Sequence, residues 1–211
     1  SVAKTPSTKE DQSEGFLEGI LKTTQDLSLV STIIHGTTVA TNALLERKGA
    51  KTGIITTKGF RDVLEMRRRD RPKTWGLWGT FAPVVERKNR LEVSERTLAD
   101  GTIRVSVDEK EVENCAKILM ENGCSAVCLF FINGYANSEN EKRAAKVLRS
   151  VWPNNHVSIA TEILPEIREF ERCSTATLNA YLQPPVANYL ERLETRISNE
   201  KKKSEILIVQ S

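Results

Sequence analysis

The chain has 211 residues, 39% of them apolar and 28% charged, which are ordinary proportions for a globular protein of one large or two small domains. Its 31 basic and 28 acidic side chains leave a net charge of +3, too small to indicate a nucleic-acid partner. No apolar run approaches the roughly 20 residues of a membrane span, and the polar start lacks a signal-peptide pattern. We therefore expect a cytoplasmic protein without nucleic-acid or membrane partners.

In chain order, the first part alternates helices with short strands. Ser7 or Thr8 begins a helix whose apolar stripe includes Phe16 and Ile20. The next elements are predicted strands at residues 31–35 and 51–57 and predicted helices at 38–47 and 60–67, the first helix being closed by Gly49.

The second part contains a hairpin followed by regular alternation. Asp100-Gly101 is a strong turn signal between residues 91–95 and 103–107, where apolar and polar side chains alternate. Helices are then predicted at 109–122, 138–151 and 166–180, and strands at 126–132, 156–160 and 205–209. Pro184-Pro185 is expected to break or kink the third helix before a further long one. This order predicts an α/β fold with a largely parallel sheet and a β-hairpin insertion.

The turn between the first strand and its helix has the composition of an anion site. Amides at a helix N-terminus lack partners, and Gly36 lets a ligand approach them closely. Thr37 or Thr38 can cap the helix, and Asn42 shares a helix face with Thr38. His35 to Thr38 also follow a strand, where ligands of parallel sheets bind, so these residues and Asn42 are the predicted phosphate or substrate site. The alternative is a helix start that binds no ligand.

A second polar segment lies near residues 161–184. Glu166, Glu169 and Arg172 recur at helical spacing, so their side chains would share one face and orient a substrate or a metal ion. The alternative is a solvated helix surface with salt bridges of little energetic weight.

An arginine cluster precedes the hairpin. Arg67 and Arg71 are candidates to bind a carboxylate or phosphate in a bidentate manner. Trp75 and Trp78 follow them, and arginine stacked on tryptophan forms without any ligand, so a subunit interface is an equal alternative to a substrate clamp.

The chain has four cysteines, and their spacing is not accompanied by histidines. We expect Cys115, Cys124, Cys128 and Cys173 to be buried free thiols and not a zinc site. No serine, histidine and aspartate arrangement indicates a hydrolase triad.

Several segments together resemble the hydantoinase A/5-oxoprolinase family, which also contains ATP-dependent ketone carboxylases. They are HGTTVATNALLERKGAKTGIITTKGFRDVLEMRR (35–68), RLEVSERTLADGT (90–102), LPEIREFERCSTATLNAYLQP (164–184) and the terminal IVQS. The stretch RRRDRPKTWGLWG (67–79) is similar to the acetophenone carboxylase branch. One departure is Asn140-Glu141, where family members usually have His-Glu.

The resemblance implies an RNase H-like half of an actin/Hsp70/sugar-kinase-like fold. It implies ATP-dependent activation of an amide or ketone carbonyl oxygen by phosphorylation, with Mg²⁺, for ring hydrolysis or for carboxylation. A hydantoinase B-like subunit is the implied partner. Residues 1–211 would be the N-terminal-type region, lacking the family's N-terminal phosphate hairpin and its C-terminal half, so the remainder of the same chain is a further expected partner.

Two other functions are weighed against this one. The chain could be a non-catalytic α/β scaffold that docks a partner through the loop containing Trp75 and Trp78. A sugar-kinase-like enzyme is disfavoured because the usual context of its catalytic aspartate is not visible in the sequence.

Overall fold

The computed structural model describes the whole chain except residues 7, 9–10, 25–29, 69–80, 200–204 and 211. The chain divides into two compact units. Unit 1 comprises Ser1–Lys48 and Pro185–Ser211, and unit 2 comprises Gly49–Pro184. No helix in the described part of the chain is both long enough and apolar enough to cross a membrane.

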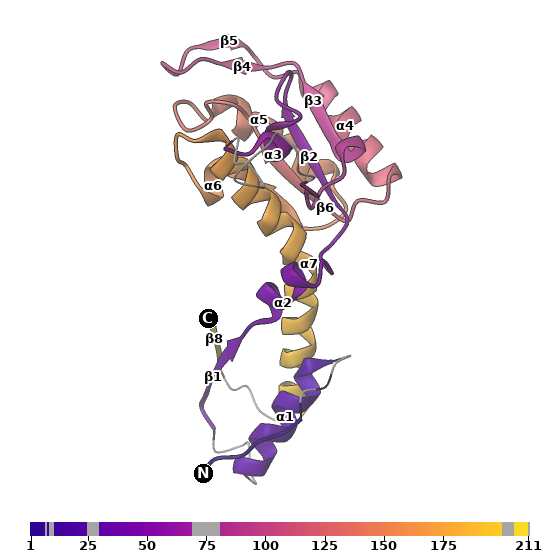
Figure 1. Cartoon of the computed structure of the whole chain (residues 1–211), viewed down its shortest axis with the longest axis vertical. Coiled ribbons are helices and arrows are strands. Elements are labelled where there is room, and N and C mark those ends of the chain that lie inside the picture. The colour runs from indigo at the N-terminus through magenta and orange to yellow at the C-terminus, as the bar shows by residue number, and fades with distance from the viewer. Residues whose placement is uncertain (7, 9–10, 25–29, 69–80, 200–204, 211) are drawn as a thin grey trace, which may run out of the picture. The chain divides into compact units, whose positions relative to one another are not determined.

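Unit 2 is built on a four-stranded sheet in the order β3-β2-β6-β7, and every neighbouring pair is parallel. The strands are β2 (Thr52–Thr57), β3 (Arg90–Val93), β6 (Ala126–Phe130) and β7 (Val157–Ile159). All residues of the two central strands, β2 and β6, are buried, as expected for a parallel sheet covered on both faces. The predicted α/β fold with a largely parallel sheet is thereby confirmed (Figure 1).

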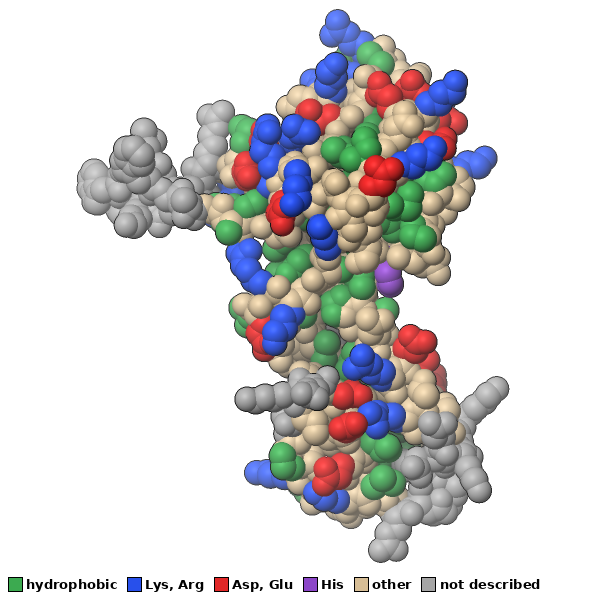
Figure 2. Space-filling model, turned by 90° about the vertical axis from the view of Figure 1, so that its right-hand side faces the viewer, with side chains coloured by type: hydrophobic (Ala, Val, Ile, Leu, Met, Phe, Trp, Pro, Cys, Tyr) green, Lys and Arg blue, Asp and Glu red, His purple; other side chains and the backbone are tan. Residues whose placement is uncertain are grey.

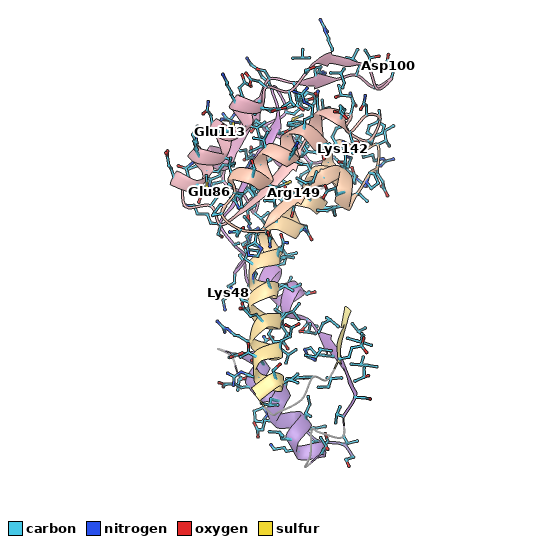
Figure 3. The ribbon with its side chains drawn as sticks, turned by 180° about the vertical axis from the view of Figure 1, so that it is seen from behind. Lys48, Glu86, Asp100, Glu113, Lys142 and Arg149 are labelled. Carbon is cyan, nitrogen blue, oxygen red and sulfur yellow. The ribbon has the colours of Figure 1, made fainter. Side chains whose placement is uncertain are left out.

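Helices cover both faces of this sheet. Ile55, Val127 and Leu129 pack with α4 (Glu109–Glu121) and α5 (Glu139–Val151). The alternate residues Ile54 and Cys128 pack with α3 (Val63–Met66), α6 (Ala160–Ile163) and the first half of α7 (Glu169–Asn199). The outer surfaces of α4 and α5 carry charged side chains, including the labelled Glu113, Lys142 and Arg149 (Figure 3).

The hairpin is shorter than predicted. It consists of β4 (Arg96–Thr97) and β5 (Ile103–Val105), with Gly101 in the left-handed region at φ +85°. The prediction that residues 91–95 pair across this hairpin is wrong, because β3 joins the parallel sheet beside β2 after the short 3₁₀ helix η2 (Arg87–Asn89). Alternating apolar and polar side chains suit both an antiparallel hairpin and a parallel sheet, so the tertiary contacts with β2 determine which strand these residues pair with.

Unit 1 has a two-stranded parallel sheet of β1 (Thr32–Thr37) and β8 (Glu205–Gln210). The sheet is accompanied by α1 (Gln12–Thr23), α2 (Val39–Leu45) and the second half of α7. A small core joins these elements and contains Ile33, Tyr189, Leu193 and Ile197. The cap of α1 is Asp11, whose carboxylate accepts the Ser13 amide at 3.1 Å, and not Thr8.

Three predicted helix boundaries are also wrong: the start at residue 166, the break at Pro184-Pro185 and the closure at Gly49. Helix α7 begins at Glu169, and it continues through Pro184-Pro185. Pro185 lacks the N–H that would bind the carbonyl of Tyr181, and the Ala50 amide donates to that carbonyl instead, at 2.8 Å. At the end of α2 the left-handed residue is Arg47, and not Gly49.

Candidate functional site

The predicted anion turn lines a cavity of about 280 Å³ within unit 1, which we call the turn cavity. The structure brings together all five residues predicted for it: His35, Gly36, Thr37, Thr38 and Asn42. Strand β1 extends through Thr37, so α2 starts only at Val39. A Cβ added to Gly36 would meet no atom within 4 Å, which leaves the backbone open to a ligand.

The hydroxyl groups of the turn are partly engaged. Thr37 Oγ1 accepts the Val39 amide at 3.3 Å, and Thr38 Oγ1 accepts from Asn42 Nδ2 at 3.2 Å. Thr38 occupies the N-cap position without capping the helix amides through its side chain. Of the two capping candidates, Thr37 therefore holds the first amide, while Thr38 and Asn42 face each other at the cavity.

His35 is the most enclosed residue of this turn. Its Nε2 lies 2.6 Å from the hydroxyl of Tyr189, and its ring lies 4.0 Å from that of Phe16, centroid to centroid. Burial lowers the pKa of His35, which favours the neutral ring. Tyr189 also lines the cavity, yet its sequence context indicates only the apolar stripe of a helix.

A second cavity, of about 530 Å³, lies within unit 2 and is called the β2-end cavity because Gly59 and Phe60, which line it, follow strand β2. Arg67 and Glu169 were predicted as parts of two separate sites, and both are in the lining of this cavity. The remaining lining residues come from the same two segments: Asp62, Val63, Met66, Arg68, Arg168, Phe170 and Glu171. The carboxyl end of a parallel strand is the general position for a ligand in such sheets.

Ion pairs fix several charges around this cavity. Arg87 holds Asp62 in a bidentate pair, with Nε–Oδ1 and Nη2–Oδ2 distances of 2.9 and 3.0 Å. Arg68 Nε donates to the Glu171 carboxylate. The Arg67 guanidinium lies over the ring of Phe81, 4.5 Å from its centroid.

Arg172 has a different environment from the one predicted. It is fully buried, and its Nη2 donates to Glu141 Oε2 at 3.4 Å, while its Nε and Nη1 have no hydrogen-bond partner among the described residues. Glu141 is fully buried as well, and it accepts the Phe131 amide at 3.1 Å and the Thr161 amide and hydroxyl at 2.7 and 2.9 Å. Arg172 is therefore a buried partner of Glu141 and does not line the β2-end cavity.

Glu166 is not on the helix. It precedes α7 and is exposed, so the predicted helix face shared by Glu166, Glu169 and Arg172 does not form. Of these three, Glu169 alone is in the cavity lining. Arg71, Trp75 and Trp78 lie outside the described residues.

A buried polar network joins the strand ends of unit 2. Thr57 Oγ1 donates to the Glu95 carboxylate and accepts the Ile132 amide at 2.9 Å. Asn140 Nδ2 donates to Glu95 and to the Val105 carbonyl, both at 2.9 Å. The sequence indicated Asn140 only as a departure from the family pattern, and the structure shows that it fixes the hairpin.

Burial governs the titration of these carboxyl groups. It raises the pKa of Glu95 and of Glu141, because desolvation of the charged form outweighs the hydrogen bonds that favour it.

The four cysteines are free and buried, as predicted, and burial raises the pKa of Cys115 to about 11 and that of Cys173 to about 12. In the described part of the chain, no group of three or more His, Cys, Asp and Glu side chains is placed to hold a metal ion.

Comparison with known proteins places the chain in a family. The sequence model of the hydantoinase/oxoprolinase N-terminal region matches residues 1–152. An uncharacterized protein of Methanocaldococcus jannaschii is 34% identical over 100% of this chain and 32% of its own length. The caprolactamase alpha subunit of Pseudomonas jessenii is 31% identical over 90% of this chain and 29% of its own length. The acetophenone carboxylase gamma subunit of Aromatoleum aromaticum is 29% identical, over 89% of this chain and 29% of its own length.

Structural comparison agrees. The crystal structure of the ATP-dependent caprolactamase from Pseudomonas jessenii superposes with a TM-score of 0.86 at 29% identity, covering 99% of this chain and 32% of that one. The chain thus spans 29–32% of the length of these relatives. These matches confirm the resemblance inferred from the sequence.

Proposed function

We propose, because this chain belongs to the hydantoinase/oxoprolinase N-terminal-region family, that it is part of an ATP-dependent enzyme subunit that activates a carbonyl oxygen by phosphorylation. The substrate would be a small amide or ketone, and the activated group would then be hydrolysed or carboxylated. The observation that carries the proposal is the gathering of all five turn residues around one cavity, with Gly36 leaving its backbone accessible.

The chemistry requires charge stabilisation more than covalent participation. When the carbonyl oxygen attacks the γ-phosphorus of ATP, a new P–O bond forms and the bond to the β–γ bridging oxygen breaks, which releases ADP. Negative charge spreads over the transferred phosphoryl group during this step, so preorganised donors stabilise it. Uncharged hydrogen-bonding groups around the turn cavity suit that role: the Thr37 and Thr38 hydroxyls, the Asn42 amide and the His35 ring.

The two cavities receive different proposed roles. We assign the phosphate-binding role to His35, Gly36, Thr37, Thr38 and Asn42 in the turn cavity. The β2-end cavity would orient the organic substrate through Arg67 and Glu169, and Arg172 would act indirectly by holding the first turn of α7.

The proposed cofactor, partner and location follow from the class of ATP-dependent enzyme. Mg²⁺ in phosphoryl-transfer sites is held mainly by water and phosphate oxygens with one or two carboxylates, and we assign it no ligand from this chain. The relatives named alpha and gamma subunits support a multisubunit assembly, in which a hydantoinase B-like subunit would be the partner. An ATP-consuming enzyme of this kind is expected in the cytoplasm.

The test is ATP hydrolysis by the assembled enzyme with Thr38→Ala and Glu169→Ala. We expect kcat/KM for ATP to fall by about tenfold with Thr38→Ala, because a hydrogen bond to a charged group is lost. Glu169→Ala is expected to change the KM for the organic substrate. The matched control is Glu121→Gln, an exposed residue at the end of α4, which should leave both constants unchanged. Unchanged turnover in both site variants would remove the site assignment.

A further inference from the structure

His35 and Tyr189 form a buried pair at the turn cavity. They are 154 positions apart in the sequence, and Nε2 of His35 lies 2.6 Å from the hydroxyl oxygen of Tyr189. From this contact we propose that Tyr189 is a positioning residue: its hydroxyl donates to Nε2, which places the proton of the neutral imidazole on Nδ1 as a donor for a phosphate oxygen. This inference deepens the proposed function, on which it rests for the phosphate-binding role of the turn cavity.

Both side chains are held inside unit 1. Charged side chains are spread over the visible surface of the molecule (Figure 2), whereas His35 and Tyr189 are each 8% exposed. The ring of Phe16, on α1, lies against the His35 ring at an interplanar angle of 55°. Tyr189, on α7, belongs to the small core of unit 1 and also lines the turn cavity. Contacts from α1 and α7 therefore fix the imidazole ring and shield its hydrogen bond from water.

Acidity decides which of the two groups donates. Burial raises the pKa of Tyr189 and outweighs the opposing effect of the Thr37 hydroxyl, so the phenol keeps its proton. Burial lowers the pKa of His35, so its ring is neutral and one ring nitrogen is an acceptor. A phenol is a stronger acid than neutral imidazole, and an imidazole nitrogen is a stronger base than a phenol oxygen, so the O–H···N arrangement is favoured. The 2.6 Å distance agrees, because N–H donors usually lie about 2.7–3.2 Å from an oxygen acceptor.

The position of the proton matters for an anionic ligand. With Nε2 engaged as an acceptor, Nδ1 carries the hydrogen and can donate it to a phosphate oxygen. The other tautomer would present the lone pair of Nδ1, which repels that oxygen. The hydroxyl groups of Thr37 and Thr38 can rotate to donate or to accept, whereas an imidazole ring needs a proton transfer to exchange its donor atom. Tyr189 thereby controls a property of the turn that the local sequence around His35 does not specify.

Nitrogen-15 NMR of the 211-residue chain reads the position of this proton. The chain has two histidines, so ¹⁵N-labelled histidine gives two sets of ring signals, and His156→Gln assigns them. At about pH 8, where the ring is neutral, we expect His35 to be protonated on Nδ1 and unprotonated on Nε2. Tyr189→Phe keeps the aromatic ring and removes the hydroxyl, so both tautomers should become populated.

The matched control is a second tyrosine of the same helix. Tyr181 is buried on α7 and does not line the turn cavity. Tyr181→Phe should therefore leave the ring signals of His35 unchanged. If Tyr189 had a packing role alone, Tyr189→Phe would likewise leave the tautomer unchanged.

Kinetics of the assembled enzyme supply the second measurement. Tyr189→Phe should lower kcat/KM for ATP by about fivefold, because part of the population then lacks the Nδ1 donor, and Tyr181→Phe should not lower it. The inference is overturned if His35 of the unsubstituted chain carries its proton on Nε2, or if Tyr189→Phe leaves the tautomer unchanged. It is also overturned if Thr38→Ala lowers kcat/KM and Tyr189→Phe does not. Failure of the proposed function is distinguishable, because kcat/KM would then be insensitive to Thr38→Ala as well, while the NMR signals still report the tautomer.

Discussion

Replacing Glu141 by alanine is expected to destabilise unit 2 severely, because Glu141 joins four groups at the carboxyl ends of β6 and β7. Its carboxylate accepts the Phe131 amide and the amide and hydroxyl of Thr161, at distances between 2.7 and 3.1 Å, and pairs with Arg172. Alanine would leave the fully buried Arg172 without its counter-charge.

The magnitude follows from these contacts. A hydrogen bond to a charged group contributes about 1.5–3 kcal/mol, so at the lower value the three neutral donors to Glu141 together contribute about 4.5 kcal/mol before the protein relaxes. Removing one partner of a buried ion pair costs about 3–5 kcal/mol by itself. The effects overlap because they share one carboxylate, and we expect Glu141→Ala to lower the free energy of unfolding by about 4 kcal/mol. That is a large part of the roughly 5–15 kcal/mol of a typical domain.

Urea unfolding followed by circular dichroism measures this effect, and a double-mutant cycle isolates the pair. Arg172→Met should cost less, about 1–3 kcal/mol, because Glu141 keeps its three other donors and methionine fills the space. The double variant Glu141→Gln/Arg172→Met should lose less free energy of unfolding than the sum of the losses in the Glu141→Gln and Arg172→Met single variants, by at least about 1 kcal/mol. Additive single effects, or a loss below about 1 kcal/mol for Glu141→Ala, would refute the reasoning.

Three further predictions concern glycines, pH and thiols. Gly49→Ala should lower the free energy of unfolding by more than about 2 kcal/mol, because the added Cβ would lie 2.1 Å from the Tyr181 ring. Gly36→Ala should leave the thermal midpoint nearly unchanged, because no atom lies within 4 Å of its added Cβ. Equal thermal midpoints for the two variants would contradict this prediction. Burial raises the pKa of Glu95, so the folded state holds its proton more tightly, and stability should fall as pH rises from the ordinary value of 4.5 through the folded pKa. In Glu95→Gln, midpoints measured between about pH 4 and 7 should lose part of this slope, and an unchanged slope would exclude Glu95 as its source. Cys173, with a pKa of about 12, should resist a thiol reagent at pH 8 in the folded protein and react in urea, and fast labelling without denaturant would show that it is accessible.

The sequence by itself determined the local elements and the family. The apolar run at Ala126–Phe130 and the 3.6-residue periodicity of Glu109–Glu121 specify a buried strand and an amphipathic helix, and the structure has both. The Gly36 turn was also visible in the sequence, because a glycine between a strand and a helix is a local signal, and its five predicted residues meet at one cavity.

Tertiary structure decided what depends on partners distant along the chain. Pro185 lies inside a helix, and the Ala50 amide satisfies the Tyr181 carbonyl that Pro185 cannot bind, a contact between residues 131 positions apart that no local pattern contains. Arg172 has the spacing of a solvent-facing residue relative to Glu169, yet Glu141 provides the counter-charge that allows its burial. Periodicity indicates which residues share a helix face, whereas folding sets which group lies opposite that face. For a charged side chain, the opposite group decides whether the side chain is available to a ligand or is buried in an ion pair.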